Sequence, residues 1–304
     1  MFRTAELGQK IPKSEFKQRE PVLRAELLEV QARLSQSGSF PVIIVFAGVD
    51  GAGKGDTVNL LNEWMDPRWL MTKAYDKPSD EERERPEYWR YWRALPPKGR
   101  IGLFLSSRYS RPVLDRVSEK IGEQQFDNRL DRVLSFEQDL ADDGALILKF
   151  WMHLGKEAQR KRLKKLEKDP LTSWRVTQRD WDHWHLYERF VAVAERTIMR
   201  TNIGTAPWFI VEGMDPCYRS LTVGTIIRDE INRHLEEIEA KKAAMEALRQ
   251  AGSAAPVEVA EETEGEVPGL LPRKTVLSTL DMSLHLNKAD YRKQLRDYQA
   301  RLNL

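Results

Sequence analysis

Residues 42–57, VIIVFAGVDGAGKGDT, combine a run of glycines with one lysine and two aspartates. Glycines let successive backbone N–H groups turn inward to form a concave anion site, and a following helix adds its positive N-terminal end. The spacing from Gly48 to Gly53 and Lys54 is that of a phosphate-binding loop, with an apolar run before it and a helical pattern after it. We therefore predict that the loop binds phosphate and that Lys54 reaches the outer phosphates.

The loop departs from the common pattern at one position. Lys54 is followed by Gly55, where a serine or threonine hydroxyl usually helps to hold magnesium. Asp50 lies inside the loop, and a carboxylate beside phosphates repels them unless a cation lies between. We therefore expect Mg²⁺ at Asp50. The alternative is that Asp50 only caps the following helix.

A second candidate region is the segment at residues 83–100, RERPEYWRYWRALPPKGR. Arginines among aromatic rings can stack on a base or bind an anion. Tyrosine and tryptophan at helical spacing are equally typical of a hydrophobic core, and the pattern leaves both interpretations open. The side chains in question are Arg83, Arg85, Arg90, Arg93, Tyr88, Trp89, Tyr91 and Trp92.

A third region, KEAQRKRLKKLEKDPLTSWR at residues 156–175, is strongly basic. Such a run is typical of a solvated helix face, and it could also bind a polyanion in general. In phosphoryl-transfer enzymes, mobile segments of this kind close over the phosphates and bring arginines to the developing charge. We expect such a lid at about residues 155–200. Its cations are Lys156, Arg160, Lys161, Arg162, Lys164, Lys165, Lys168 and Arg175.

These groups need a rigid framework, and four short apolar runs provide the pattern for one. The runs at 41–49, 101–105, 145–151 and 207–211 show no alternation, as expected for strands covered on both faces of a parallel sheet. Helical patterns separate them, and a helical lead-in is expected over residues 1–36. Strand and helix in this order predict a three-layer α/β/α fold around a parallel central sheet, with right-handed crossovers.

The composition fits a cytoplasmic enzyme. The 304 residues can bury a large core, and 49 basic against 47 acidic residues leave a net charge of +2, so nucleic acid is not expected as a partner. Cys217 is the single cysteine, which excludes an intramolecular disulfide. No apolar run approaches the roughly 18 residues that would span a bilayer, so no membrane association is expected.

The sequence changes character after a long helical pattern that ends near residue 249. The following stretch is rich in Ala, Gly, Pro and Glu, which predicts a flexible acidic linker over residues 250–272. The closing residues LRDYQARLNL, 295–304, are similar to LLEVQARLSQ, 27–36, which leads into the loop strand. Either two charged helices are similar by chance, or residues 273–304 begin the lead-in to a second, absent domain.

On these motifs the chain resembles the polyphosphate kinase 2 family, bacterial enzymes that transfer phosphate between inorganic polyphosphate and nucleotides. The landmarks occur in the family's order between about residues 41 and 219: GVDGAGKG, YWRYWRALPPKGRIGLF, KFWMHLGKEAQRKRLKKLEKDPLTSWRVTQRD and TAPWFIVEG. One class of the family carries two fused copies and phosphorylates AMP to ADP. The resemblance therefore implies the N-terminal half of such a tandem.

The resemblance also implies a P-loop kinase-like domain over residues 37–249, Mg²⁺ as cofactor, and polyphosphate and AMP or ADP as substrates. A second homologous domain or a homo-oligomer is the implied partner. The Arg-Trp segment would line a phosphate or nucleotide channel, and Arg175 would belong to the lid. The predicted catalytic residues are Asp50, Lys54 and Arg111, with Asp50 as the metal ligand. The predicted phosphate- or nucleotide-binding residues are Gly48, Gly51, Gly53, Gly55, Asp56, Thr57, Arg108 and Arg175.

The chain differs from the family pattern near the second predicted strand. The family has an acid followed by Arg-Ser-x-Tyr-x-Arg there, whereas this chain has Leu105 and Ser106 in place of the acid and the first arginine. Its late Asp-Lys pair reads Asp215-Pro216. A second carboxylate usually positions Mg²⁺ and the attacking group. Two hypotheses follow: a polyphosphate-dependent phosphotransferase acting on a nucleoside monophosphate, or a degenerate half that binds phosphate and has a structural role.

Overall fold

The computed structural model describes residues 1–253, 287–291, 294–295 and 298. Residues 1–247 form one compact unit and residues 248–304 a second. Helix α10 (Pro216–Ser253) continues through the first residues of the predicted linker. The rest of that linker, residues 254–272, and most of the predicted lead-in at 273–304 lie outside the described residues.

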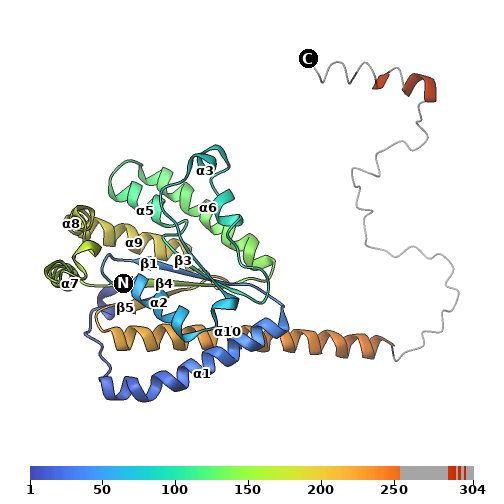
Figure 1. Ribbon diagram of the computed structural model, residues 1–304. Helices are drawn as coiled ribbons and strands as arrows, with labels where there is room; N and C mark the ends of the chain where they lie inside the picture. The colour runs from blue at the N-terminus through green and yellow to red at the C-terminus, as the bar shows by residue number, and fades with distance from the viewer. Residues whose placement is uncertain (254–286, 292–293, 296–297, 299–304) are drawn as a thin grey trace. The chain divides into compact units, whose positions relative to one another are not determined.

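A five-stranded parallel sheet forms the centre of the first unit (Figure 1). Four strands coincide with the apolar runs of the sequence. The fifth, β2, was not predicted, because its sequence LMTKA is only partly buried at the sheet edge and contains no continuous apolar run. In sheet order the strands are β2 (Leu70–Ala74), β3 (Ile101–Leu105), β1 (Val42–Gly48), β4 (Leu146–His153) and β5 (Trp208–Glu212).

Strand β1 occupies the middle of the sheet, paired with β3 on one side and β4 on the other. Its first five residues, VIIVF, are all buried, which explains why the sequence shows no polar alternation there. The strand order reverses at β1, since β2 and β3 lie on one side and β4 and β5 on the other. Open parallel sheets bind ligands outside the carboxyl ends of their strands at such a switch point. The glycine-rich loop begins there.

Helices cover both faces of the sheet, which confirms the predicted three-layer α/β/α arrangement (Figure 1). One face carries α1 (Lys13–Ser37), α2 (Lys54–Trp64) and α10. The other carries α5 (Ser110–Val117), α6 (Glu123–Asp142) and α9 (Tyr187–Thr201). Shorter pieces are η1 (Phe2–Ala5), η2 (Pro67–Trp69), α3 (Asp80–Glu84) and α4 (Trp89–Trp92).

Helices α1, α2 and α10 approach one another closely at Gly224 of α10. A Cβ added there would lie 2.9 Å from Leu23 of α1 and 3.1 Å from Trp64 of α2. On α1 the buried residues Leu23, Leu27, Val30 and Leu34 recur every three or four positions, so one stripe of the helix faces the core. This packing fixes α2, and with it the loop that precedes α2.

The predicted lid at residues 155–200 divides into two parts. Helices α7 (Lys156–Lys168) and α8 (Gln178–His185), with the turn η3 (Ser173–Arg175) between them, lie beside the glycine-rich loop (Figure 1). Helix α9, in contrast, packs on α5 and α6 and buries Val193, Ala194 and Ile198. We therefore use "lid" for residues 156–185 only.

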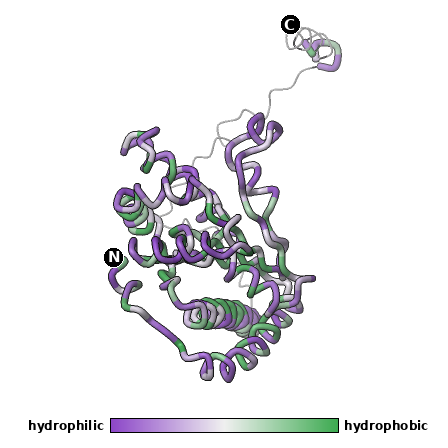
Figure 2. The backbone as a smooth tube through the Cα atoms, turned by 60° about the vertical axis from the view of Figure 1, so that its left-hand side comes forward, coloured by the Kyte–Doolittle hydropathy of each residue, from purple (hydrophilic) through white to green (hydrophobic). Residues whose placement is uncertain are grey.

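Hydrophobic and hydrophilic residues alternate along the outer helices, as the tube in Figure 2 shows by colour. The continuous apolar segments are the strands of the sheet. Within the described part of the chain, no helix has both the length and the apolar character needed to cross a membrane.

Candidate functional site

The glycine-rich loop, residues 48–53, joins β1 to α2 and depends on glycine at both ends. Gly48, at φ +130°, lies so close to β4 that an added Cβ would be 2.1 Å from the Met152 carbonyl oxygen. Gly53, at φ +86°, faces Arg219, whose guanidinium an added Cβ would meet at 2.3 Å. Side chains at these positions would displace the loop or its neighbours. Because α2 begins at Lys54, the positive end of the helix lies at the loop.

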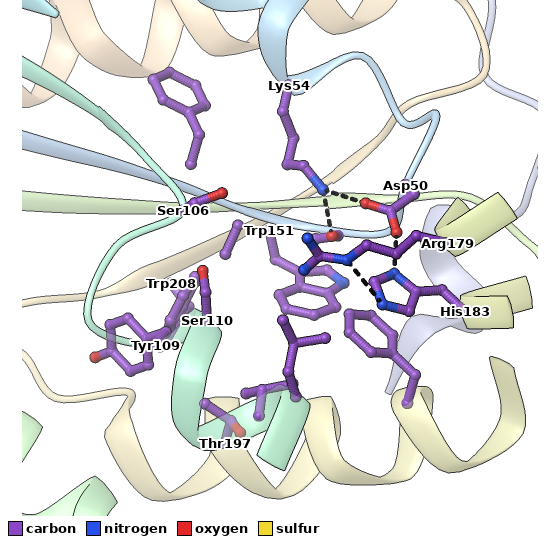
Figure 3. Close-up of a pocket in the computed structure, with 16 residues that line it drawn as sticks. Asp50, Lys54, Ser106, Tyr109, Ser110, Trp151, Arg179, His183, Thr197 and Trp208 are labelled. Carbon is purple, nitrogen blue, oxygen red and sulfur yellow. Dashed lines mark hydrogen bonds and ion pairs between the residues drawn. The ribbon is translucent and has the colours of Figure 1, made fainter. Parts of the chain in front are cut away.

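Lys54 reaches back across the loop from the first turn of α2 (Figure 3). Its Nζ donates hydrogen bonds to the carbonyl oxygens of Gly48 at 2.6 Å and Val49 at 3.1 Å. The same ammonium lies 3.5 Å from Asp50 Oδ1. Lys54 is therefore held at the loop by the backbone, where an entering anion would meet its charge.

The carboxylate of Asp50 connects the loop to the lid. His183 Nδ1 of α8 lies 2.7 Å from Asp50 Oδ2, and Arg179 Nε of the same helix lies 3.5 Å from His183 Nε2 (Figure 3). Burial of Asp50 opposes ionisation, but Lys54 and His183 outweigh it and hold the pKa of the carboxyl well below its usual value. Asp50 is therefore an anion at neutral pH, with cationic or hydrogen-bonding neighbours on two sides.

A cavity of about 110 Å³ opens beside Asp50 and Lys54 (Figure 3). Aromatic side chains from the strand ends and α9 line part of it, namely Phe46, Trp151, Phe190 and Trp208. The lid contributes Arg179 and His183. Ligand pockets commonly measure roughly 300–1,000 Å³. With the lid in this position the cavity therefore has room for only part of a ligand of that size.

Ser106 lines the same cavity at the carboxyl end of β3 (Figure 3). Its φ of +52° lies in the left-handed region, which residues other than glycine seldom adopt. Backbone of this kind persists where the surroundings hold it, and it is found preferentially at binding sites. Leu105, the preceding residue, places an apolar side chain where the family pattern has an acid.

Three arginines surround the predicted phosphate-binding residue Asp56 in the first turn of α2. Arg175 Nη2 lies 2.7 Å from Oδ1, and Arg162 Nη2 and Arg219 Nη2 lie 3.3 and 4.0 Å from Oδ2. The Asp56 side chain is thus engaged by cations. Burial opposes ionisation, but hydrogen bonding to Arg175 and the three positive charges lower the pKa of Asp56. Thr57, also predicted, is buried and accepts a hydrogen bond from Arg219 Nε at 3.0 Å.

Two other predicted residues are paired with carboxylates that do not belong to the loop. Arg108 is buried and donates to Glu137. Lys149 Nζ lies 2.7 Å from Glu137 Oε2, and the Tyr109 hydroxyl donates to Oε1 at 2.8 Å. Arg108 therefore belongs to a buried ion-pair network. Arg111 is exposed, with its Nε 3.8 Å from Asp115 on the same helix.

The Arg-Trp segment is largely occupied with its own contacts. Arg90 lies over the rings of Tyr75 and Tyr91 and pairs with Glu82 at 3.4 Å, with a side chain only 11% exposed. Arg85 and Arg93 lie over the ring of Trp89. Of the two interpretations of this segment, packing describes these contacts better than an open binding surface.

The structure thus brings together Asp50, Lys54, the loop glycines, Asp56, Thr57 and Arg175. It adds three side chains that were not predicted: Arg179, His183 and Arg219. Arg179 and His183 are four residues apart on α8, so their spacing indicates a shared helix face but not what that face meets. Arg219 is 162 residues from its partner Thr57, and no local pattern identifies such a contact.

Comparison with known proteins identifies the group to which this site belongs. The family profile of polyphosphate kinase 2 matches residues 10–239, which contain the loop, the lid and the whole sheet. The chain belongs to the polyphosphate kinase 2 family. Its fold agrees with crystal structures of polyphosphate kinase 2 proteins from Pseudomonas aeruginosa (TM-score 0.75, 39% identity) and Arthrobacter aurescens (TM-score 0.70, 25% identity). These matches cover 99% and 74% of this chain and 55% and 81% of the respective structures.

Curated relatives within the polyphosphate kinase 2 family carry names that describe phosphotransferases. A polyphosphate:AMP phosphotransferase from Pseudomonas aeruginosa is 44% identical over 302 residues, which is 99% of this chain and 58% of the relative. An AMP/ADP-polyphosphate phosphotransferase from Meiothermus ruber is 29% identical over 206 residues, 68% of this chain and 77% of the relative. The chain therefore spans little more than half the length of the first of these relatives.

Proposed function

We propose that the chain transfers the terminal phosphate of inorganic polyphosphate to a nucleoside monophosphate, converting AMP to ADP. The observation that carries this proposal is the loop itself: Lys54 and the ionised Asp50 lie at the positive end of α2, with an arginine-bearing lid in contact with both the loop and α2. The name of the Pseudomonas aeruginosa relative, polyphosphate:AMP phosphotransferase, supports the choice of substrates.

In the proposed reaction a phosphate oxygen of AMP attacks the terminal phosphorus of polyphosphate. One P–O bond forms, the bond to the next phosphate breaks, and polyphosphate leaves shorter by one unit. Phosphoryl transfer of this kind is accelerated mainly by positioning and by neutralising the charge on the phosphate oxygens. Lys54 would exchange its bonds to the loop carbonyls for phosphate oxygens, and Arg175 and Arg179 would add charge from the lid.

We further propose Mg²⁺ as cofactor. Among the residues that the structure describes, no three or more His, Cys, Asp or Glu side chains are grouped so that they could hold a metal. Mg²⁺ usually keeps several waters and takes one or two carboxylates together with substrate phosphates. The ionised Asp50 fits that minimal role, provided that the phosphates supply the other ligands. The bound ion would offset negative charge on the phosphates.

A second homologous domain, or a second copy, is proposed as the partner. The similarity between residues 27–36 and 295–304 supports this proposal. So does the 58% coverage of the Pseudomonas aeruginosa relative, which leaves much of that protein unmatched.

The purified chain, polyphosphate, AMP and Mg²⁺ provide the test. We expect ADP to form in the wild type, and Lys54→Ala to lower the rate by at least about a hundredfold, the scale of losing one electrostatic contact in a transition state. A circular dichroism spectrum and melting curve of Lys54→Ala control for folding. ADP formation at the same rate in Lys54→Ala would overturn the proposal.

The alternative is a half that binds phosphate but transfers it poorly. Nothing in the names of the relatives indicates it. The observations that motivate it are Leu105 in place of an acid, Ser106 in place of an arginine and Pro216 in place of a lysine. Polyphosphate binding without ADP formation would distinguish this alternative from the phosphotransferase.

A further inference from the structure

Asp56 is contacted by arginines from three separate parts of the chain. Arg162 comes from α7, Arg175 from the turn η3, and Arg219 from the first turn of α10. The sequence separations are 106 and 119 residues for the two lid arginines. A single carboxylate on α2 therefore connects helix α7 and the turn η3 of the lid to the helix that follows the glycine-rich loop.

The charges around Asp56 do not balance. Three guanidinium groups face the Asp56 carboxylate, and Asp215 is a further acid near Arg219, so positive charge remains in excess. Arg219 cannot turn away into solvent, because its side chain is 4% exposed and its Nη1 donates to the Gly213 carbonyl oxygen at 2.9 Å. The arrangement is thus an anion site in which one carboxylate of the protein already occupies part of the space.

Asp56 lies at a position of the helix where negative charge is favoured. It is two residues beyond Lys54, in the first turn of α2, where the helix end favours negative charge. Arg175 approaches from the lid with a side chain 37% exposed, so it is free to exchange one oxygen ligand for another. Arginine binds carboxylate and phosphate oxygens in the same way.

We propose that Asp56 is a tethered anion: it holds the lid arginines Arg162 and Arg175 at the loop when polyphosphate is absent, and polyphosphate displaces it when it binds. The inference rests on the proposed function, since it takes polyphosphate as the displacing anion. Asp56 is then a positioning residue. It closes the lid before substrate arrives and weakens polyphosphate binding by competing for the same guanidinium groups.

Asp56→Asn removes the charge while keeping the size and shape of the side chain. Asp131→Asn is the matched control. Asp131 lies on α6 and is likewise paired with an arginine, Arg200 of α9, at 2.7 Å. Binding of a polyphosphate of defined length is measured by calorimetry. We expect Asp56→Asn to bind about three- to tenfold more tightly than the wild type, as fits the modest strength of partly exposed ion pairs, and Asp131→Asn to match the wild type.

Hydrogen exchange of the full chain provides a second, independent measurement. We expect faster exchange at residues 169–176 in free Asp56→Asn than in free wild type, because Arg175 has lost its anchor. Saturating polyphosphate should remove the difference. Weaker or unchanged polyphosphate binding in Asp56→Asn, or an equal gain in Asp131→Asn, would overturn the inference. If neither wild type nor Asp56→Asn binds polyphosphate, the proposed function fails, and the displacement of Asp56 by polyphosphate fails with it. Faster exchange in free Asp56→Asn would then show only that Asp56 holds the lid.

Discussion

His183 of the lid and Asp50 of the glycine-rich loop are 133 residues apart in sequence, yet His183 Nδ1 lies 2.7 Å from Asp50 Oδ2. The ionised carboxylate can only accept, so the ring donates its Nδ1–H, and Nε2 is left to accept from Arg179. This orients the Asp50 side chain from the lid. The lid in this position thus contacts the residue that we propose as the metal ligand.

The first prediction concerns this contact. Hydrogen bonds to charged groups contribute about 1.5–3 kcal/mol, and partial exposure places this one near the lower end. His183→Ala should therefore lower kcat/KM for polyphosphate-dependent ADP formation about tenfold, whereas His183→Asn, which keeps a donor near Nδ1, should retain more activity. His185→Ala is the control, because His185 is exposed two residues further along the chain, in the same helix. Equal losses in His183→Ala and His185→Ala would argue against the contact.

The sequence was sufficient to predict those parts of the site whose residues are contiguous in the chain. A buried central strand must be apolar throughout, and a phosphate-binding turn must have glycine where other residues clash, so β1 and the loop could be read directly. Edge strand β2 was missed because half exposure removes that signal. His183 and Arg219 were missed because their partners lie more than a hundred residues away, and only tertiary packing brings them together.

The same reasoning applies to the ion pair of Arg108, which the sequence did not predict. It lies between the serine and the tyrosine of the family's Ser-x-Tyr-x-Arg pattern, but its carboxylate partner Glu137 lies on α6, 29 residues further on. A sequence records that an arginine is present near a site. It does not record whether a buried carboxylate of another helix neutralises that arginine first.

Gly48 provides a test of how tightly the loop is built. Gly48→Ala would place a Cβ 2.1 Å from the Met152 carbonyl oxygen at a φ of +130°. Both the clash and the backbone conformation are unfavourable, so we expect a loss of at least about 3 kcal/mol in the free energy of unfolding. Gly55→Ala is the control, since nothing lies within 4 Å of its added Cβ and alanine favours helices. Urea unfolding measures both, and comparable losses would contradict this account of the loop.

Glu137 is predicted to be a stability residue. Glu137→Gln would leave Arg108 and Lys149 as buried cations without their carboxylate, and breaking a buried ion pair from one side costs about 3–5 kcal/mol. Asp131→Asn, on the exposed side of the same helix, should cost less than about 1 kcal/mol. Chemical denaturation separates the two. An unchanged unfolding midpoint in Glu137→Gln, together with weaker polyphosphate binding, would instead support the prediction that Arg108 binds phosphate.

The free energy of unfolding should decrease as the pH is lowered, because two histidines resist protonation in the folded chain. Burial lowers the pKa of His153, although Glu6 partly opposes it, and burial likewise lowers the pKa of His234. Below pH 6.5 the unfolded chain therefore takes up protons that the folded chain does not, so stability is full above about pH 6.5 and decreases as the pH falls toward the folded pKa values. Between pH 7.5 and 5.5 the melting temperature of wild type should decrease more than that of His153→Gln or His234→Gln. Parallel curves would contradict this assignment.

Leu105 decides between the two functions considered for this chain. Leu105→Asp supplies the second carboxylate that phosphoryl-transfer sites use to position Mg²⁺ and the attacking group, and Leu105→Asn has the same shape without the charge. The single substitution changes only the position of the missing acid and leaves Ser106 as it is, so its result has one cause. Suppose that Leu105→Asp forms ADP at least about tenfold faster than Leu105→Asn, which corresponds to an activation barrier lower by about 1.4 kcal/mol. The missing acid then limits an otherwise competent site. If both variants fold and neither exceeds wild type, the acid is not what limits transfer. A wild type without measurable ADP formation would then favour the phosphate-binding half.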